Sequence, residues 1–281
     1  QKSTIPCLEG VLLRAGVALQ LTGYNLETGI TVHVGAQIQE AGSCVMPARL
    51  FFDIVRKLPD EMVSITVDHK QQVSIRAGAA FFQITAMDSE DYPELPDVNG
   101  KSGVTMPQSA LKAMISGTIF SVSENQARPI QTGCLMEVTE DSVTMVAVDS
   151  FRLARRTWHT ENAANHTLKF VVPAAGLKEI ERILEDSDEP VTFTLGDKHI
   201  LFSIGDALLV SRVLEGEFID WRRVVPTNCG TVLTANVAEL TSSIERVSLI
   251  ISEKVKSPVR CVFGDNMADF RTANTIGSAH D

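Results

Sequence analysis

The sequence predicts an α+β protein made of tandem repeats of one duplicated unit, in which a helix is followed by antiparallel strands. Three observations favour this fold class. Two long segments of the chain match each other, helical segments recur at similar intervals, and segments with alternating apolar residues follow each helix. Strands that follow one another without helices between them are typical of antiparallel sheets.

The longest repeat joins two segments that begin at Pro47 and Pro173. Pro47 falls on Pro173 and Tyr92 on Phe218, and both pairs are 126 residues apart, so the segments align without a gap. Each segment contains a proline, an amphipathic helix and then strands. Chance similarity between amphipathic segments is the alternative, but several anchors agree on one spacing. The sequence therefore predicts two copies of one domain.

A second repeat extends the pattern to three copies. Leu111 corresponds to Leu240 and Pro129 to Pro258, both 129 residues apart. The opening STIPCLEGVLL matches ARPIQTGCLME, and LTGYNLETG corresponds to VAVDSFRLA and to RTANTIGSA. The four helices are centred near Leu50, Leu111, Leu177 and Leu240, which are 61, 66 and 63 residues apart. Two helix-plus-strand units therefore make one domain of about 125 residues.

The repeat also predicts the domain boundaries. Segments with Pro, Gly and Asn place them near Asn99–Gly103 and Pro226–Gly230, so the domains are expected at residues 1–99, 100–226 and 227–281. The second domain is complete by this comparison. The first lacks roughly 20 residues at its N-terminal side, and the third lacks its C-terminal half, roughly 70 residues.

The predicted helices each present one apolar face. Pro47 and Pro173 stand just before helical segments, where a missing backbone N–H costs little. Residues that are spaced three or four positions apart lie on the same side of a helix. The residues that predict the buried faces are Leu50, Ile54 and Leu58 in one helix, and Leu177, Ile180 and Leu184 in another.

The predicted strands alternate between apolar and polar residues, so one sheet face is expected to be buried and the other wet. Turn signals such as Gly196 and Asp197 separate the strands. The alternating apolar residues are Val17, Leu19 and Leu21; Ile30, Val32 and Val34; Val143, Met145 and Ala147; and Phe193 and Leu195.

Charge and composition limit the functional classes. The 281 residues carry a net charge of −10, and DNA phosphates attract Lys and Arg but repel an acidic protein. A protein of this charge that acts on DNA must therefore carry a local basic surface, or be held on DNA by topology instead of strong contacts. No apolar run approaches the ~18 residues of a membrane span, and the first residues contain no signal peptide. Five scattered cysteines without a CxxC motif predict a reduced, cytoplasmic protein.

No motif for catalysis or metal binding stands out. There is no Gly-rich phosphate loop and no HExxH, and the six histidines are dispersed. The carboxylates of Asp88, Glu90 and Asp91 read as a solvated loop rather than a metal site. We therefore predict no catalytic residue, no metal and no cofactor. An enzyme whose site is assembled from the repeats without a sequence signature is the alternative.

Five sequence blocks resemble one known family in their content and their order. They are STIPCLEGVLL, LTGYNLETGI, ENQARPIQTG, VAVDSFRLARR and GEFIDWRRVVP, of which VAVDSFRLA together with FIDWRRVVP is the most specific. These blocks resemble the bacterial β sliding clamp, subunit β of DNA polymerase III, over essentially the whole chain. The resemblance implies a DNA clamp fold with three similar domains per subunit. It further implies a homodimer joined head to tail in a closed ring around duplex DNA, which acts as a non-catalytic processivity factor of replication.

The resemblance implies that the helices line the hole of the ring. Encirclement fits the acidic charge, because affinity then need not come from many phosphate contacts, and contacts with phosphates carry no sequence information. The alternative is that these basic helix faces contact only solvent and not DNA. The acidic residues Asp53, Glu179 and Glu181 lie among the basic ones and reduce the positive charge of the faces. The predicted DNA-facing residues are Arg49, Arg56, Lys57, Lys112, Asn125, Gln126, Arg128, Lys178, Arg182 and Arg246.

The resemblance also implies a peptide-binding pocket between the second and third domains. Its ligands are short tails, typically with Gln, Leu and Phe, of the DNA polymerase III catalytic subunit, the clamp loader, other polymerases and repair proteins. The family often has Leu at the position of Gln131, Thr at that of Val148 and Pro at that of Ile219. These three differences are expected to affect the affinity for peptides. Plain core packing is the alternative for Leu153 and Val224. The predicted pocket residues are Gln131, Val148, Ser150, Phe151, Arg152, Leu153, Ile219, Arg223 and Val224.

Overall fold

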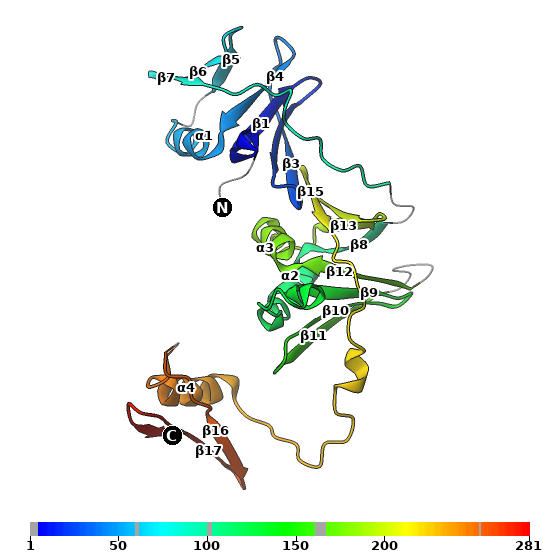
Figure 1. Ribbon diagram of the computed structural model, residues 1–281, viewed down its shortest axis with the longest axis vertical. Coiled ribbons are helices and arrows are strands. Elements are labelled where there is room, and N and C mark those ends of the chain that lie inside the picture. Colours follow the sequence, from blue (N-terminus) through cyan, green and yellow to red (C-terminus); the bar gives the residue numbers. More distant parts are fainter. Residues whose placement is uncertain (1–4, 60–61, 100–102, 161–166, 253) are drawn as a thin grey trace. The chain divides into compact units, whose positions relative to one another are not determined.

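The computed structural model describes residues 5–59, 62–99, 103–160, 167–252 and 254–281 of the chain. Contacts divide the chain into two compact units, residues 1–220 and residues 221–281 (Figure 1). The first unit contains two copies of the repeated domain, and the second contains one helix packed on three strands. The expected boundary at Asn99–Gly103 includes residues 100–102, which lie outside the described residues.

In the first domain copy, the strands of one antiparallel sheet come before the single α-helix in the sequence, and those of a second sheet come after it. One sheet has the order β4-β1-β2-β3 within the domain, and the other has the order β5-β6-β7. The elements are η1 (Pro6–Glu9), β1 (Gly10–Ala15), β2 (Leu19–Tyr24), β3 (Thr28–Val34), β4 (Gly42–Pro47), α1 (Ala48–Val55), β5 (Ser64–Val67), β6 (Gln72–Ala77) and β7 (Ala80–Thr85).

The second copy repeats this arrangement and has a further strand and helix in front. Its sheets have the orders β12-β9-β10-β11 and β8-β13-β14-β15, and α2 packs beside α3. The α+β fold class with a duplicated unit is therefore confirmed. The elements are β8 (Gly103–Pro107), α2 (Gln108–Ser116), η2 (Ile119–Ser121), η3 (Pro129–Thr132), β9 (Gly133–Val138), β10 (Ser142–Val148), β11 (Leu153–His159), β12 (Leu168–Pro173), α3 (Ala174–Ile183), β13 (Pro190–Leu195), β14 (His199–Ile204) and β15 (Ala207–Arg212).

The second unit matches the first half of the second copy. Its strands form the antiparallel sheet β16-β17-β18, and α4 packs against β17 and β18. The side chain of Asn236 caps α4 by accepting hydrogen bonds from the backbone N–H of Ala238 and Glu239. The elements are η4 (Trp221–Arg223), α4 (Val237–Ser248), β16 (Arg260–Gly264), β17 (Met267–Ala273) and β18 (Ser278–His280).

One turn recurs with the same hydrogen bonds in all three copies and sets the register of the repeat. Its first residue is Asn or Asp, whose side-chain oxygen accepts from the backbone N–H groups two and three residues later. Equivalent turn residues are 124 and 249 positions apart (149 − 25 and 274 − 25). These three Asx turns are Asn25–Thr28, Asp149–Arg152 and Asn274–Gly277.

The main core lies in the second copy, between the helices and the sheets. Leu111, Leu177 and Ile180 point from α2 and α3 into a cluster that contains the fully buried rings of Phe193 and Phe202. These two ring centroids are 5.9 Å apart and tilted by 43°. Burial of such apolar side chains stabilises the fold by about 1.5–3 kcal/mol each. The second copy therefore has an extensive apolar core.

The predicted buried face of the first helix is confirmed at Ile54 and wrong at Leu50. Phe51 and Ile54 are buried in the core of the first copy, whereas Leu50 is 46% exposed. Successive helix residues are 100° apart, and here the larger Phe51 takes the buried side while Leu50 faces solvent. Leu58 still packs against this core. The prediction for α3 is confirmed, since Leu177, Ile180 and Leu184 are all buried.

The expectation that each sheet has one wet face is wrong for β9 and β10. Every residue of β9 is buried, as are Val143–Val148 of β10. The same holds in part for the first copy, where Tyr92 covers the outer face of its sheet and packs with Leu12 and Val45. Burial raises the pKa of Tyr92 to about 12, and its hydroxyl donates to the carbonyl of Thr22 at 3.1 Å.

Two further details of the strand prediction are corrected. Val17 lies in the bend between β1 and β2 and is fully exposed. The gapless 126-residue match fails in the hairpins, where Gly78 and Gly205, with φ of 55° and 53°, are 127 residues apart. A positive-φ glycine fixes the position of a tight turn, whereas the connection before the strands can absorb one more residue. The same shift separates the isolated bridges Val45–Met87 and Val171–Leu214.

The two domain copies of the first unit are joined by a shared sheet. β3 of the first copy pairs antiparallel with β15 of the second, with Thr28 opposite Ser211 and Val32 opposite Ala207. The result is one eight-stranded sheet with the order β4-β1-β2-β3-β15-β14-β13-β8 (Figure 1). An exposed strand edge in one copy is thereby closed by an edge of the next.

Candidate nucleic-acid and peptide interfaces

The basic residues of the first helix lie on its solvent side. Arg49, Arg56 and Lys57 are all exposed, and the guanidinium of Arg56 stacks over the ring of Phe52 at 5.8 Å. Asp53 lies among them and is exposed as well. A guanidinium above an aromatic face keeps its charge while its position is restricted. The helix therefore offers a modest positive surface that includes an exposed aromatic ring.

In the second copy, part of the predicted basic surface is already paired. Arg182 Nη1 lies 2.8 Å from Glu179 Oε1 on the same helix, an exposed pair that contributes little to stability. Lys178 is exposed and Lys112 is half-buried. A ligand phosphate would have to compete with Glu179 for Arg182. Lys178 is thus the better-placed cation of α3.

The loop before η3 carries the remaining predicted contacts of this copy. Asn125, Gln126 and Arg128 are exposed, and Asn125 Oδ1 accepts a hydrogen bond from the backbone N–H of Ala127 at 2.9 Å. The carbonyl of Asn125 also accepts from the N–H of Arg128 at 3.1 Å. This turn presents the side chains of Gln126 and Arg128 to solvent on a fixed backbone.

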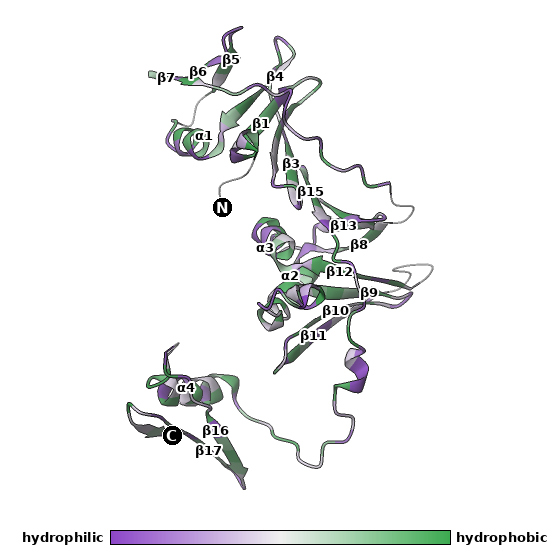
Figure 2. Ribbon diagram, viewed as in Figure 1, coloured by the Kyte–Doolittle hydropathy of each residue, from purple (hydrophilic) through white to green (hydrophobic). Residues whose placement is uncertain are grey.

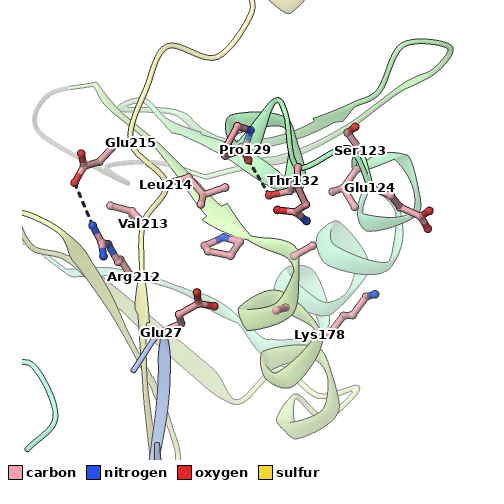
Figure 3. Close-up of a pocket in the computed structure, with 15 residues that line it drawn as sticks. Glu27, Ser123, Glu124, Pro129, Thr132, Lys178, Arg212, Val213, Leu214 and Glu215 are labelled. Carbon is pink, nitrogen blue, oxygen red and sulfur yellow. Dashed lines mark hydrogen bonds and ion pairs between the residues drawn. The ribbon is translucent and has the colours of Figure 1, made fainter. Parts of the chain in front are cut away.

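A hollow of about 610 Å³ brings two of the predicted DNA-facing residues together (Figure 3). It lies at the start of α3, where Gln126 from the loop and Lys178 from the helix are both part of the lining. Glu27 from the first domain copy and Arg212 from β15 line it too. We call it the junction hollow, because both domain copies contribute to its wall.

Arg246, the predicted contact in the second unit, is neutralised within that unit. Its Nη2 lies 2.6 Å from Asp281 Oδ2, and its Nε donates to Oδ1 at 3.0 Å. The hydrogen bonds from Arg246 and Ser243 lower the pKa of Asp281 to about 2. Such a bidentate pair holds the guanidinium in one orientation. Arg246 is therefore the weakest of the predicted DNA contacts.

The central residues of the predicted peptide pocket meet at the second Asx turn. Asp149 accepts the N–H groups of Phe151 and Arg152, and its Oδ2 lies 2.9 Å from Arg152 Nε. The hydrogen bond from the Phe151 backbone is the largest cause that lowers the pKa of Asp149. The turn leaves the side chain of Phe151 97% exposed. Val148 is buried opposite the half-buried Leu153, where β10 pairs with β11.

The other predicted pocket residues lie elsewhere in the chain. Ser150 is exposed on the turn, and Gln131 is half-buried in η3, where its carbonyl accepts the N–H of Ser123 at 2.8 Å. Ile219 is half-buried at the end of the first unit. Arg223 and Val224 belong to the second unit, and both are exposed. The first unit thus presents the turn and its flanking residues as one surface.

Sequence reasoning missed the sheet edge formed by β7. Phe81 is 50% exposed and Phe82 is also exposed, although the run FFQI reads as a buried strand. The guanidinium of Arg76 lies over the ring of Phe81 at 4.6 Å. Neighbouring residues of a strand point to opposite faces, so two adjacent phenylalanines cannot enter one core. That pattern is the signal that could have revealed an interaction surface.

No group of three or more His, Cys, Asp or Glu side chains in the described part of the chain is arranged to hold a metal ion. None of the helices in those residue ranges combines the length and the apolar character needed to cross a membrane.

Comparison with known proteins gives consistent results over the whole chain. Residues 1–96 match the family model of the DNA polymerase III beta subunit N-terminal domain, and residues 105–220 match that of its central domain. The beta sliding clamp of Staphylococcus epidermidis is 29% identical, over 100% of this chain and 77% of the relative. A DNA polymerase III beta subunit structure from Eubacterium rectale is 31% identical with a TM-score of 0.94, covering 99% of this chain and 76% of that one. The sliding clamp structure from Bacillus subtilis is 29% identical with a TM-score of 0.91, covering 100% and 77%.

Proposed function

Because the chain belongs to the family of bacterial β sliding clamps, the β subunits of DNA polymerase III, we propose that two copies of it close into a ring around duplex DNA. The family is one of replication processivity factors, which are non-catalytic subunits, and this chain is such a factor. The alternative of an enzyme on the same scaffold has no support.

The observation that carries the ring is the shared sheet of the first unit. There, the strand that follows an Asx turn, β3, pairs with the last strand of the next domain copy, β15. β18 also follows an Asx turn, and β7 is the last strand of the first copy. Both are edges of their sheets in the described structure. By the same rule, β18 of one copy pairs with β7 of a second, and two such contacts close a ring.

The register of this proposed pairing follows from the repeat. Ile30 of β3 lies opposite Leu209 of β15, and the equivalent residues are Ala279 and Phe82. Pairing would also cover the exposed ring of Phe82, which the chain alone leaves in water. The division into domains at residues 1–99, 100–226 and 227–281 agrees with this scheme, since the second and third domains would begin before the repeated helices α2 and α4. We propose the same division here, and a cytoplasmic location for the replication protein.

The ring explains how an acidic chain remains on DNA. Topology prevents dissociation sideways, so the exposed basic residues of α1 and α3 need supply only weak contacts with phosphates. Arg49, Arg56 and Lys178 are the best-placed candidates, because Arg182 and Arg246 have carboxylate partners on the same unit. Contacts of this kind allow movement along the duplex.

Encirclement predicts retention that depends on DNA topology. We expect the protein, assembled on a nicked circular plasmid by a clamp loader with ATP, to stay bound during gel filtration. Cutting the plasmid once should release it, because a ring slides off a free end. The measurement is the fraction of labelled protein that co-elutes with DNA before and after cutting. Equal retention on circular and linear DNA would contradict encirclement and favour simple surface binding.

The second Asx turn is proposed to bind the partner proteins. Its exposed Phe151 and the half-buried Leu153 give an apolar surface with Arg152 beside it, which suits a short peptide with Leu and Phe anchors. Polymerase and clamp-loader subunits with such tails are the proposed partners, together with other polymerases and repair proteins. Gln131 and Ile219 belong to the same proposed surface, and Arg223 and Val224 are proposed peptide contacts of the second unit.

Leu153→Ala should weaken peptide binding without breaking the fold. Removal of one apolar wall is expected to cost about 1–2 kcal/mol of binding, roughly a 5- to 30-fold rise in Kd. A fluorescent peptide with Gln, Leu and Phe titrated into the wild type and the variant measures it. Leu26→Ala, in the first Asx turn, is the matched control and should leave Kd unchanged. Equal affinities of wild type and Leu153→Ala would show that the peptide binds elsewhere.

A further inference from the structure

The segment that connects the two domain copies of the first unit lies across the outer face of the sheet that they share. It runs from β7 to β8 (Figure 1), and its residues 93–99 contain no helix or strand. Hydrophobic and hydrophilic colours alternate along it in Figure 2. We call residues 92–98, with the sequence YPELPDV, the strap. Three of its side chains, spaced three residues apart, each contact a different part of the first unit.

The two prolines of the strap favour a stiff, extended backbone. The rings of Pro93 and Pro96 fix their own φ angles, and the residue before a proline is restricted to extended conformations. That second restriction applies to Tyr92 and Leu95. Such a sequence favours the polyproline II conformation, which has three residues per turn. Tyr92, Leu95 and Val98 are therefore expected along one side of the strap.

Tyr92 attaches the start of the strap to the first domain copy. Its ring is buried with Leu12 of β1, and its hydroxyl donates to the backbone carbonyl of Thr22 in β2 at 3.1 Å. Leu12 and Thr22 lie opposite each other where these two strands pair. One hydrogen bond and one apolar contact therefore hold this end of the strap on two neighbouring strands of the first copy.

Leu95 lies on β3, the strand of the first copy that pairs with the second copy. A Cβ atom added to Gly29 of β3 would lie 2.1 Å from Leu95 Cδ2 and 3.0 Å from Tyr24 Cδ2. The leucine side chain therefore occupies the space that any residue larger than glycine would need at this position. Gly29 lies opposite Val210 of β15, which is buried. Leu95 thus packs where the strands of the two copies meet.

Val98 attaches the end of the strap to the second domain copy. A Cβ atom added to Gly196, in the turn between β13 and β14, would lie 3.1 Å from Val98 Cγ1. The three residues from Leu95 to Val98 span about 9 Å in a polyproline II conformation, and two strand spacings measure about 9.5 Å. Two spacings separate β3 from β14 in the order β3-β15-β14. The length of the strap therefore suits contacts on both sides of the β3–β15 pair.

We propose that the strap fixes the angle between the two domain copies, with Leu95 as its central contact. Pairing alone does not fix the twist between two strands, which varies from about −10° to −35°. A stiff segment that contacts both sides of the β3–β15 pair restricts this twist. The helices α1 and α3, which belong to different copies, are thereby kept in one relative orientation. This inference goes beyond the proposed ring, because it concerns a single chain.

The distance between spin labels in the two copies tests the strap. The exposed Cys229 and Cys261 are changed to Ser, and labels are attached at Arg14→Cys in β1 and Ser116→Cys in α2, both exposed positions. Labelled chain is diluted with excess unlabelled chain, so that double electron–electron resonance measures distances within one chain. Leu95→Ala should broaden the distance distribution about twofold or more, because the twist of a strand pair without such a contact varies over roughly 25°.

Two further variants separate the strap contact from a general loss of stability. Gly29→Ala places a methyl group against Leu95 from the other side and should broaden the distribution as well. Leu26→Ala, at an exposed leucine of the neighbouring turn, should leave it unchanged, and circular dichroism checks that each variant is folded. Unchanged distributions in Leu95→Ala and Gly29→Ala, or equal broadening in Leu26→Ala, overturn the inference. Neither result affects the proposed ring, which is tested by retention on circular DNA.

Discussion

Replacing Arg49, Arg56, Lys112 and Arg182 together by glutamate should shorten the residence of the protein on closed circular DNA by at least about tenfold at ~0.1 M salt. Four positive charges become negative, so the inner helix faces would repel the phosphates that they now attract. The steepness of the salt dependence should fall as well, because fewer counterions are displaced on binding. Residence time on nicked plasmid, measured over a series of salt concentrations, gives both quantities.

A second variant with the same change in net charge distinguishes contacts made by the helices from an effect of the protein's overall charge. Arg14, Lys70, Lys198 and Arg260 are exposed and belong to strands or turns instead of helices. Their joint replacement by glutamate should shorten residence much less. Each exposed substitution in either set should change stability by only about 0.5 kcal/mol. If both sets act equally, the helices do not face the DNA and only net charge matters.

Phe202→Ala should have the largest effect on stability of any single change considered for this chain. The ring is fully buried in the main core beside Phe193, so truncation leaves a cavity that the surrounding sheet and helices cannot fill. The expected loss is about 3–5 kcal/mol in the free energy of unfolding of that part of the chain. Urea unfolding followed by circular dichroism measures it through the midpoint at an unchanged slope.

Phe120→Ala is the matched control, because this ring is 57% exposed in the same domain copy. Its truncation should change the midpoint by less than about a fifth of the Phe202→Ala effect, in line with surface substitutions. A small effect at Phe202 would mean that the second copy repacks easily. The core would then not fix the position of α2 and α3.

The sequence predicted correctly those features that depend on residues close together in the chain. Each of the four helices lies where its proline or apolar period placed it, because helix faces and caps are set within a few residues. Leu50 was placed on the wrong side of α1, since Leu50 and Phe51 are both apolar and only the packed structure decides which enters the core. Burial of both faces of β10 was missed for a similar reason. It depends on cover from distant parts of the chain.

The candidate sites divide in the same way. Val148 and Ser150–Leu153 lie together because one short turn holds them, so their sequence block identifies them directly. Arg246 was predicted as an open cation, but its carboxylate partner, Asp281, is 35 residues away in sequence. The pairing of β3 with β15 and the junction hollow join residues from different copies. The residues of these contacts lie far apart in the sequence and come together only in the folded chain.

The three Asx turns also explain how copies of one ancestor could diverge in role without risk to the fold. In each turn the hydrogen bonds come from the first residue and the backbone, so the tip side chain is free to vary. The tips are Glu27, Phe151 and Ile276, three chemistries on one backbone. A duplicated gene could therefore change the recognition properties of each copy by single substitutions at the tip. Exchange of tip residues between the turns is a route to engineered assemblies with new partners.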